Sequence, residues 1–158
     1  MARSAYNTIF LGSIAGTRPV VLEAIADEAD IKPGMLVEYE AAQEIQKHAT
    51  AGGVVKGPMI ALESQVPNDD DAASIDIVYT ADDTMWFAQA RRGEVYNMLV
   101  AASQGALQKG INVLISNGDG TLKDETVDGD TVAGSIVGVV DQDLANVAAV
   151  QRCAVRIL

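Results

Sequence analysis

The sequence has one cysteine, one histidine and four prolines among its 158 residues, and only 4% of them are aromatic. The single cysteine, Cys153, excludes an internal disulfide, which fits a reducing cytosol or a particle assembled there. Because Cys153 lies in an apolar stretch, we interpret it as a small buried hydrophobic residue. The single histidine, His48, excludes a multi-histidine metal site. The sequence also lacks the Gly-x-Ser-x-Gly elbow of a catalytic serine. We therefore interpret His48 as a surface or hydrogen-bonded histidine.

Positive charge is also scarce. The chain has 11 Lys and Arg residues against 22 Asp and Glu, a net charge of −11 and a pI of about 4.3. Such a surface repels phosphate backbones and anionic membranes, so we expect neither nucleic acid nor a membrane as a direct partner. No apolar run approaches the roughly 18 residues of a membrane span, and the N-terminus lacks the long apolar core of a signal peptide. No phosphate-binding or dinucleotide motif occurs, so no cofactor is expected.

Hydrophobic residues make up 49% of the chain and are divided into short segments by turn signals. Met35, Val37 and Tyr39 alternate with other residues, which is the period of a half-buried strand. Roughly eight to ten such segments predict an all-β barrel or sandwich with at most one or two short helices. Residues 41–53 are ambiguous, since Ala, Gln and Glu favour a helix that two glycines would stop. Residues 91–103 could form a short helix or a strand.

The first 19 residues differ from the rest. They mix Ser, Thr, Asn and Gly with one apolar cluster, Ile9-Phe10-Leu11, and show no sustained period. The pair Arg18-Pro19 closes this segment. We therefore predict an extended N-terminal arm over residues 1–19 and a single barrel-like domain over residues 20–158.

Two stretches of the sequence resemble each other. Residues 31–39 (IKPGMLVEY) and 107–115 (LQKGINVLI) both place a glycine three positions after an apolar residue, with apolar residues following. Gly34 and Gly110 would supply the positive φ of a tight turn before a strand. A Gly-x-apolar-x-Gly element downstream of each suggests a bent strand with close backbone approach. The chain can thus be two related β-units that close one barrel, or the likeness can be chance. These downstream elements are Gly53, Val55 and Gly57, and Gly134, Ile136 and Gly138.

Acidic loops are the candidate metal sites. Residues 116–125 (SNGDGTLKDE) carry several side-chain oxygens, but their spacing does not match an EF-hand loop. Asn-Gly and Asp-Gly are common hairpin turn pairs, so we predict a turn between two strands. Asp69–Asp71 and Asp82–Asp83 are interpreted as solvated loop tips rather than weak cation sites. We therefore assign no catalytic, cofactor-binding or metal-binding residue.

Two dipeptides are candidates for contacts with other subunits. Arg91-Arg92 precedes a glycine and could close a turn or contact an acidic neighbour. Trp86-Phe87 is the densest aromatic spot. Since adjacent residues of a strand face opposite ways, one of them should enter the core and the other face outward or into an interface.

The order of these features resembles the head decoration, or capsid cement, proteins of tailed bacteriophages. The resemblance covers residues 30–158. It is carried mainly by residues 79–101 (YTADDTMWFAQARRGEVYNMLVA) and 107–122 (LQKGINVLISNGDGTL), with an apolar arm before them and a terminal AVRIL. These are patterns of turns and strands and not catalytic signatures.

The resemblance implies a small β-barrel or β-tulip domain without enzymatic activity. Such proteins are assembled in the host cytoplasm, sit on the capsid exterior of the virion, often as homotrimers, and clamp adjacent major capsid proteins. The arm would add a strand to a capsid edge. The implied capsid contacts are Tyr6, Ile9, Phe10, Leu11, Arg91 and Arg92, and the implied subunit interface contains Trp86 or Phe87.

Two alternatives stay open. The first is another virion module, such as a tail-tube or adaptor domain, which would also assemble through edge strands. The second is a small β-barrel enzyme or ligand-binding domain, because the KPGM and QKGI turns are similar to those of β-clip barrels that bind sugars or small acids. Ionisable residues with shifted pKa values around a pocket would favour the second.

Overall fold

The computed structural model describes residues 8–64, 74–127 and 134–158. This part of the chain forms strands and two three-residue 3₁₀ turns, Ser74–Asp76 and Glu125–Val127, which confirms the predicted all-β class. The strands are β1 (Phe10–Ser13), β2 (Val20–Ala26), β3 (Leu36–Ala41), β4 (Glu44–Lys47), β5 (Met59–Ala61), β6 (Thr84–Gln89), β7 (Glu94–Val100), β8 (Val113–Ser116), β9 (Leu122–Asp124), β10 (Ile136–Val140) and β11 (Gln151–Ile157).

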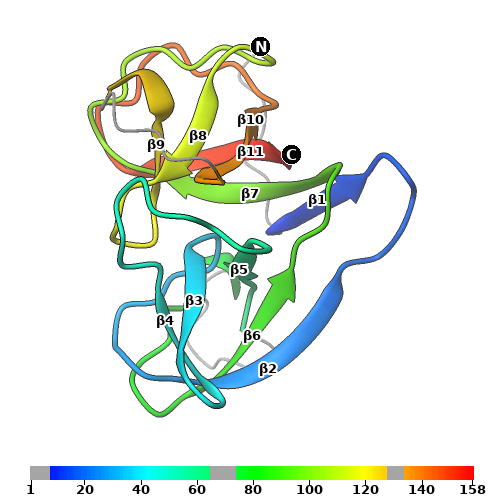
Figure 1. Ribbon diagram of the computed structural model, residues 1–158, viewed down its shortest axis with the longest axis vertical. Coiled ribbons are helices and arrows are strands. Elements are labelled where there is room, and N and C mark those ends of the chain that lie inside the picture. Colours follow the sequence, from blue (N-terminus) through cyan, green and yellow to red (C-terminus); the bar gives the residue numbers. More distant parts are fainter. Residues whose placement is uncertain (1–7, 65–73, 128–133) are drawn as a thin grey trace.

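The strands form two closed sheets (Figure 1). In the first barrel, β2, β4, β3, β5 and β6 follow one another around a ring. In the second barrel the order is β7, β11, β10, β8 and β9, and β9 returns to β7 through a parallel pair, Val100 and Leu122. β1 lies outside this second ring and pairs with β7, which lies on the side of the second barrel that faces the first in Figure 1.

The two barrels have the same topology. In each, the first strand is antiparallel to the last and parallel to the third, while the second pairs with the third and the fourth. The sequence likeness is therefore a structural repeat. Gly34 and Gly110 have φ of 90° and 75°, as predicted. The expectation that both units close one barrel is wrong, because the third strand of each unit returns to the first strand of its own unit.

The two Gly-x-apolar-x-Gly elements do not correspond as expected. Gly138 does lie in a bent strand with close backbone approach, since a Cβ there would meet Arg156 O at 2.5 Å. However, the residue of the first barrel that is equivalent to Gly138 is Met59 and not a glycine. Gly138 pairs with Ile157 of β11 in the same way as Met59 pairs with Gln89 of β6. The two elements touch instead, because Val55 N–H donates to Gly134 O at 3.0 Å.

Tertiary packing decides the ambiguous segments. Residues 41–53 form the end of β3 and a turn, with Gln43 at φ 71°, followed by β4 and not a helix. The strand is favoured because Ile45 is fully buried in the first barrel. Residues 91–103 contain the strand β7. Residues 74–80 contain no strand, and Tyr79 forms a single β-bridge to Ile31.

The apolar core has two clusters. One fills the first barrel and includes Phe87, and the other fills the second barrel and the space between the two, with Trp86 packed against both. Cys153 lies in the larger cluster and is fully buried, which raises the pKa of its thiol to about 12. This confirms that it is a buried hydrophobic residue.

Candidate assembly surface

Residues 9–13 of the arm pack on the second barrel, where β1 adds a strand to its sheet outside the ring. Ile9 is fully buried, its N–H donates to Glu63 Oε1 at 2.5 Å, and its carbonyl accepts from Asn97 N–H at 2.7 Å. The ring of Phe10 packs edge-on against Tyr96, with centroids 5.4 Å apart. The cluster Ile9-Phe10-Leu11 thus completes the protein's own sheet and covers its own core.

The implied capsid contacts of the arm are therefore unequally exposed. The side chain of Ile9 faces the core, whereas Phe10 and Leu11 are half-buried. Ile14, just after β1, is 78% exposed. Tyr6 lies outside the described residues, as do Asp69–Asp71. Contact between any of these residues and a capsid remains a prediction.

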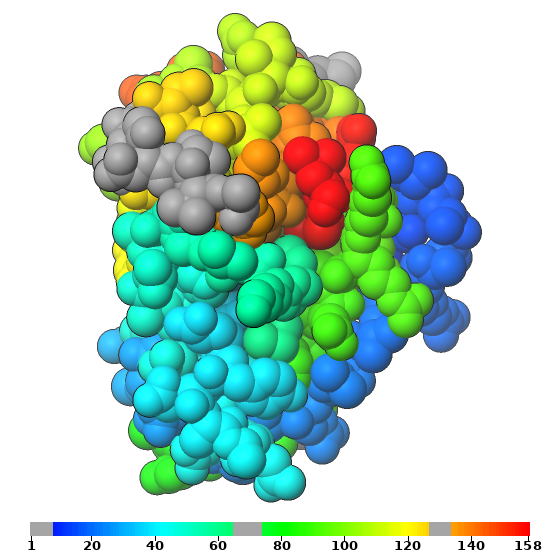
Figure 2. Space-filling view, viewed as in Figure 1, coloured from blue at the N-terminus to red at the C-terminus, as the bar shows by residue number. Residues whose placement is uncertain are grey.

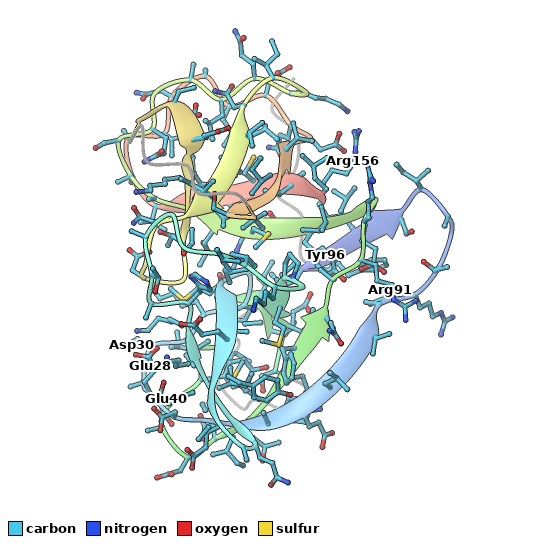
Figure 3. All side chains as sticks on the ribbon, in the orientation of Figure 1. Glu28, Asp30, Glu40, Arg91, Tyr96 and Arg156 are labelled. Atoms are coloured by element: carbon cyan, nitrogen blue, oxygen red, sulfur yellow. The ribbon has the colours of Figure 1, made fainter. Side chains whose placement is uncertain are left out.

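Arg91 and Arg92 lie on the exposed turn between β6 and β7, where the chain passes from one barrel to the other. The buried carboxylate of Glu94 fixes this turn. Arg91 N–H donates to Glu94 Oε2 at 2.8 Å, and Tyr96 Oη donates to the same oxygen at 2.7 Å. Burial, and then this bond to Glu94, raises the pKa of Tyr96 far above its usual value. Figure 3 shows the side chain of Arg91 pointing outward, where its guanidinium can bind a carboxylate.

The aromatic pair behaves as a strand predicts. Phe87 is fully buried and packs edge-on against Tyr39, with centroids 5.9 Å apart. Trp86 is only partly buried, and its Nε1–H donates to Glu23 Oε1 at 2.9 Å. Of the two, Trp86 is the residue that can reach a neighbouring subunit.

A polar contact between the barrels has no signal in the sequence. His48 Nδ1 lies 2.8 Å from Ser116 Oγ, and His48 Nε2 lies 3.6 Å from Glu38 Oε2. These residue types also occur in hydrolase triads, but Ser116 is fully buried and its hydroxyl accepts from Gly118 N–H at 3.2 Å. A nucleophile needs access to substrate, so the contact is a joint between barrels.

The acidic stretch 116–125 forms the predicted turn between β8 and β9, and it docks on the first barrel. Leu36 N–H donates to Gly120 O at 2.7 Å, and Gly52 N–H donates to Ser116 O at 2.8 Å. Burial raises the pKa of Asp119, but bonds from the Thr121 hydroxyl and N–H outweigh it, so its net pKa is lowered. The carboxylate thus closes the turn itself.

Arg152 is a second joint. From β11 its guanidinium donates to Pro33 O and Ile75 O, each at 2.6 Å, and it lies 3.8 Å from Asp76. Gly34 lies against it, because a Cβ there would meet Arg152 Nη1 at 2.6 Å. The Gly34 turn thus allows the two barrels to approach closely.

Two general features bear on function. The described part of the chain contains no helix that is long and apolar enough to cross a membrane. Among the same residues, no group of three or more His, Cys, Asp or Glu is arranged to hold a metal ion.

Comparison with known proteins gives a match in structure alone. No protein-family model matches the sequence, and no curated protein matches it. The fold is similar to that of the head fiber gp8.5 N base of bacteriophage phi29, with a TM-score of 0.52 and 14% identity. This likeness covers 89% of the present chain and 95% of the phage chain, so it includes both barrels.

Proposed function

We propose that the chain is a structural protein of a phage head, bound to the exterior of the expanded capsid after assembly in the host cytoplasm. The observation that supports this most directly is the similarity in fold, over both barrels, to the base of a phage head fiber. The order of turns and strands that resembles head decoration proteins agrees with this role, although no family model matches the sequence.

In this role the protein is a non-enzymatic clamp. It binds adjacent major capsid proteins as a homotrimer, and many modest contacts repeated on a symmetric shell give high avidity. The two joints between the barrels suit such a clamp, because they resist relative motion of its halves. The exposed residues Arg91 and Arg92 and the exposed part of Trp86 are the contacts offered to neighbouring subunits. The net charge of −11 opposes direct contact with DNA or an anionic membrane.

The test is the light-scattering mass of the purified protein, alone and mixed with expanded shells that lack it. We expect a trimer that co-sediments with shells at a saturating copy number fixed by the shell symmetry. Protein that stays in the supernatant would contradict the proposal. Immunodetection on separated heads and tails provides a second check, since a tail-tube or adaptor protein would be found with the tails.

A further inference from the structure

The repeat makes the edges of β2 and β7 comparable, residue by residue. Asp27 N–H donates to Ile45 O at 2.8 Å in the first barrel, and Ala101 N–H donates to Leu122 O at 2.8 Å at the same point of the second. The antiparallel ladders with β6 and β11 then fix the rest of the alignment. The equivalent pairs are Pro19 and Gly93, Val21 and Val95, Leu22 and Tyr96, and Glu23 and Asn97.

In the second barrel this edge is covered by β1. Phe10 lies opposite Tyr96, and the pairing is antiparallel. Asn97 N–H donates to Ile9 O at 2.7 Å at one end, and Ile14 N–H donates to Gly93 O at 3.2 Å at the other. Tyr96 is fully buried as a result.

In the first barrel the equivalent edge is open. Leu62 N–H donates to Trp86 O at 2.8 Å, so the main chain of Trp86 faces β5. Its partner Glu23 therefore turns its own N–H and C=O away from β6, toward the free edge. β4 pairs only with the last two residues of β2, Ile25 and Ala26. Among the described residues, therefore, no strand covers positions 19–23. Figures 1 and 2 show β2 at the outer surface of the first barrel.

The side chains along this edge are unusually apolar for an exposed strand. Leu22 is 36% exposed, whereas the equivalent Tyr96 is covered completely, and Val21 is 44% exposed. An edge of this kind is a template for an added strand, and natural proteins usually protect it. Its exposure indicates that another segment covers it in the assembled state.

Charge varies along the edge. Exposed basic residues lie at the end where β2 begins, and exposed acidic residues lie toward the end where it finishes. A strand that pairs antiparallel, as β1 does, therefore meets acidic groups at its start and basic groups at its end. The basic residues are Arg18, Arg91 and Arg92, and the acidic residues are Glu23, Asp27 and Glu44.

We propose that the β2 edge, from Pro19 to Glu23, binds an extended antiparallel strand of another protein of the particle. This strand carries a large apolar residue opposite Leu22, a basic residue on its N-terminal side and an acidic residue on its C-terminal side. The identity of the partner as a virion protein rests on the proposed function, whereas the strand pairing rests on the repeat. A second copy is the other candidate occupant, because β2 itself has a basic residue before Leu22 and acidic residues after it. The dependence on protein concentration tested below separates it from a partner strand.

A synthetic peptide tests the pairing without any particle. It has the sequence of residues 8–14 (TIFLGSI), with two lysines added before it and two aspartates after it. The control peptide exchanges these added charges. We expect the first peptide to slow amide hydrogen exchange of Val21 and Glu23 at least tenfold in the full-length protein, measured by NMR, and to bind more tightly than the control. No slowing, or equal binding of both peptides, would overturn the proposal.

Two variants locate the binding. Val21→Pro removes an N–H that faces the open edge and leaves the bonds to β6 intact. Val21→Lys adds charge without altering the backbone, so it serves if the proline variant does not fold. Val54→Lys is the control, since Val54 is 47% exposed and lies elsewhere. Both Val21 variants should lose peptide binding at least tenfold while the control keeps it, and the opposite pattern would count against the edge.

Shells distinguish this inference from the proposed function. If the unmodified chain and the Val21 variants bind expanded shells equally, the edge proposal fails while the head protein proposal stands. If the unmodified chain does not bind shells, the proposed function fails and the peptide result decides the edge. Protection of Val21 and Glu23 that rises with protein concentration alone would show that a second copy fills the edge, and would overturn a partner strand.

Discussion

The Nδ1 atom of His48 and the hydroxyl of Ser116 share a buried hydrogen bond, 2.8 Å long, that joins the two barrels. His48 follows the third strand of the first barrel and Ser116 ends the second strand of the second. Both residues are at most 3% exposed. A polar bond in such a dry environment is strong when made and costly when one partner is lost, so it fixes how the barrels meet.

Ser116→Ala should destabilise the protein by about 1–3 kcal/mol, because it leaves a buried imidazole nitrogen without its partner. Urea unfolding measures the change. Ser74→Ala, at an exposed position, should stay within about 0.5 kcal/mol of the unmodified protein. Combined with His48→Ala, Ser116→Ala should cost less than it does alone, and full additivity would show that the bond does not couple the barrels.

Gly34→Ala should be much more damaging than Gly110→Ala, although both glycines occupy the same turn of the repeat. Both have positive φ, so each substitution costs about 1–2 kcal/mol of backbone strain. At Gly34 the new Cβ would also lie 2.7 Å from Asn97 O, whereas nothing lies within 4 Å at Gly110. Thermal and urea unfolding of the two variants provide the comparison, and equal losses would contradict the close approach of the barrels at Gly34.

The repeat illustrates what the sequence could predict. The glycines before two similar strands carried enough information for positive φ and for two related units, because turn chemistry is local. Whether the units share one barrel depends on where β4 and β9 pair, at Ala26 and Val100. That long-range choice leaves no local pattern, so the prediction of one barrel was wrong.

The same limit applies to the candidate surface. The alternation of Trp86 and Phe87 followed from strand geometry, and the full burial of Phe87 beside a partly exposed Trp86 agrees with it. The joint between His48 and Ser116 could not be predicted, because residues 68 positions apart meet only in the folded chain. The burial of Ile9 was also missed. Residues 1–19 show no sustained hydrophobic period, so they were predicted to form an extended arm.

Ile9→Ala should cost about 2–5 kcal/mol, the usual range for a fully buried isoleucine. Ile14→Ala, five residues later and 78% exposed, should have little effect. Urea unfolding measures both. A small loss at Ile9 would mean that β1 is not part of the stable sheet. For the same reason, deleting residues 2–19 removes core contacts, so a test of the arm alone should delete residues 2–7.

Stability should fall in alkaline solution, between about pH 9 and pH 12. Burial raises the pKa of Cys153 from 9.0 to about 12 and that of Tyr79 from 10.0 to about 12. In this range the folded state holds protons that the unfolded state releases, so the free energy of unfolding decreases as pH rises. Urea unfolding from pH 8 to 11 measures the slope. Cys153→Ala should make it shallower, and an unchanged slope would show that the thiol titrates normally in the folded protein.

Replacing Arg91 and Arg92 together by Glu should weaken binding to expanded shells at least about tenfold at low salt, because both guanidinium groups are exposed and would meet acidic neighbours. The free energy of unfolding should change by no more than about 0.5 kcal/mol, because Arg91 holds the turn through its backbone N–H and not through its side chain. The matched control changes Lys32 and Lys56, both exposed, to Glu, which alters the net charge equally. If both double variants lose binding to shells to the same extent, net charge and not this turn governs binding. If only the arginine variant fails, and binding of the unmodified chain weakens as salt rises, the turn between the barrels is a contact point.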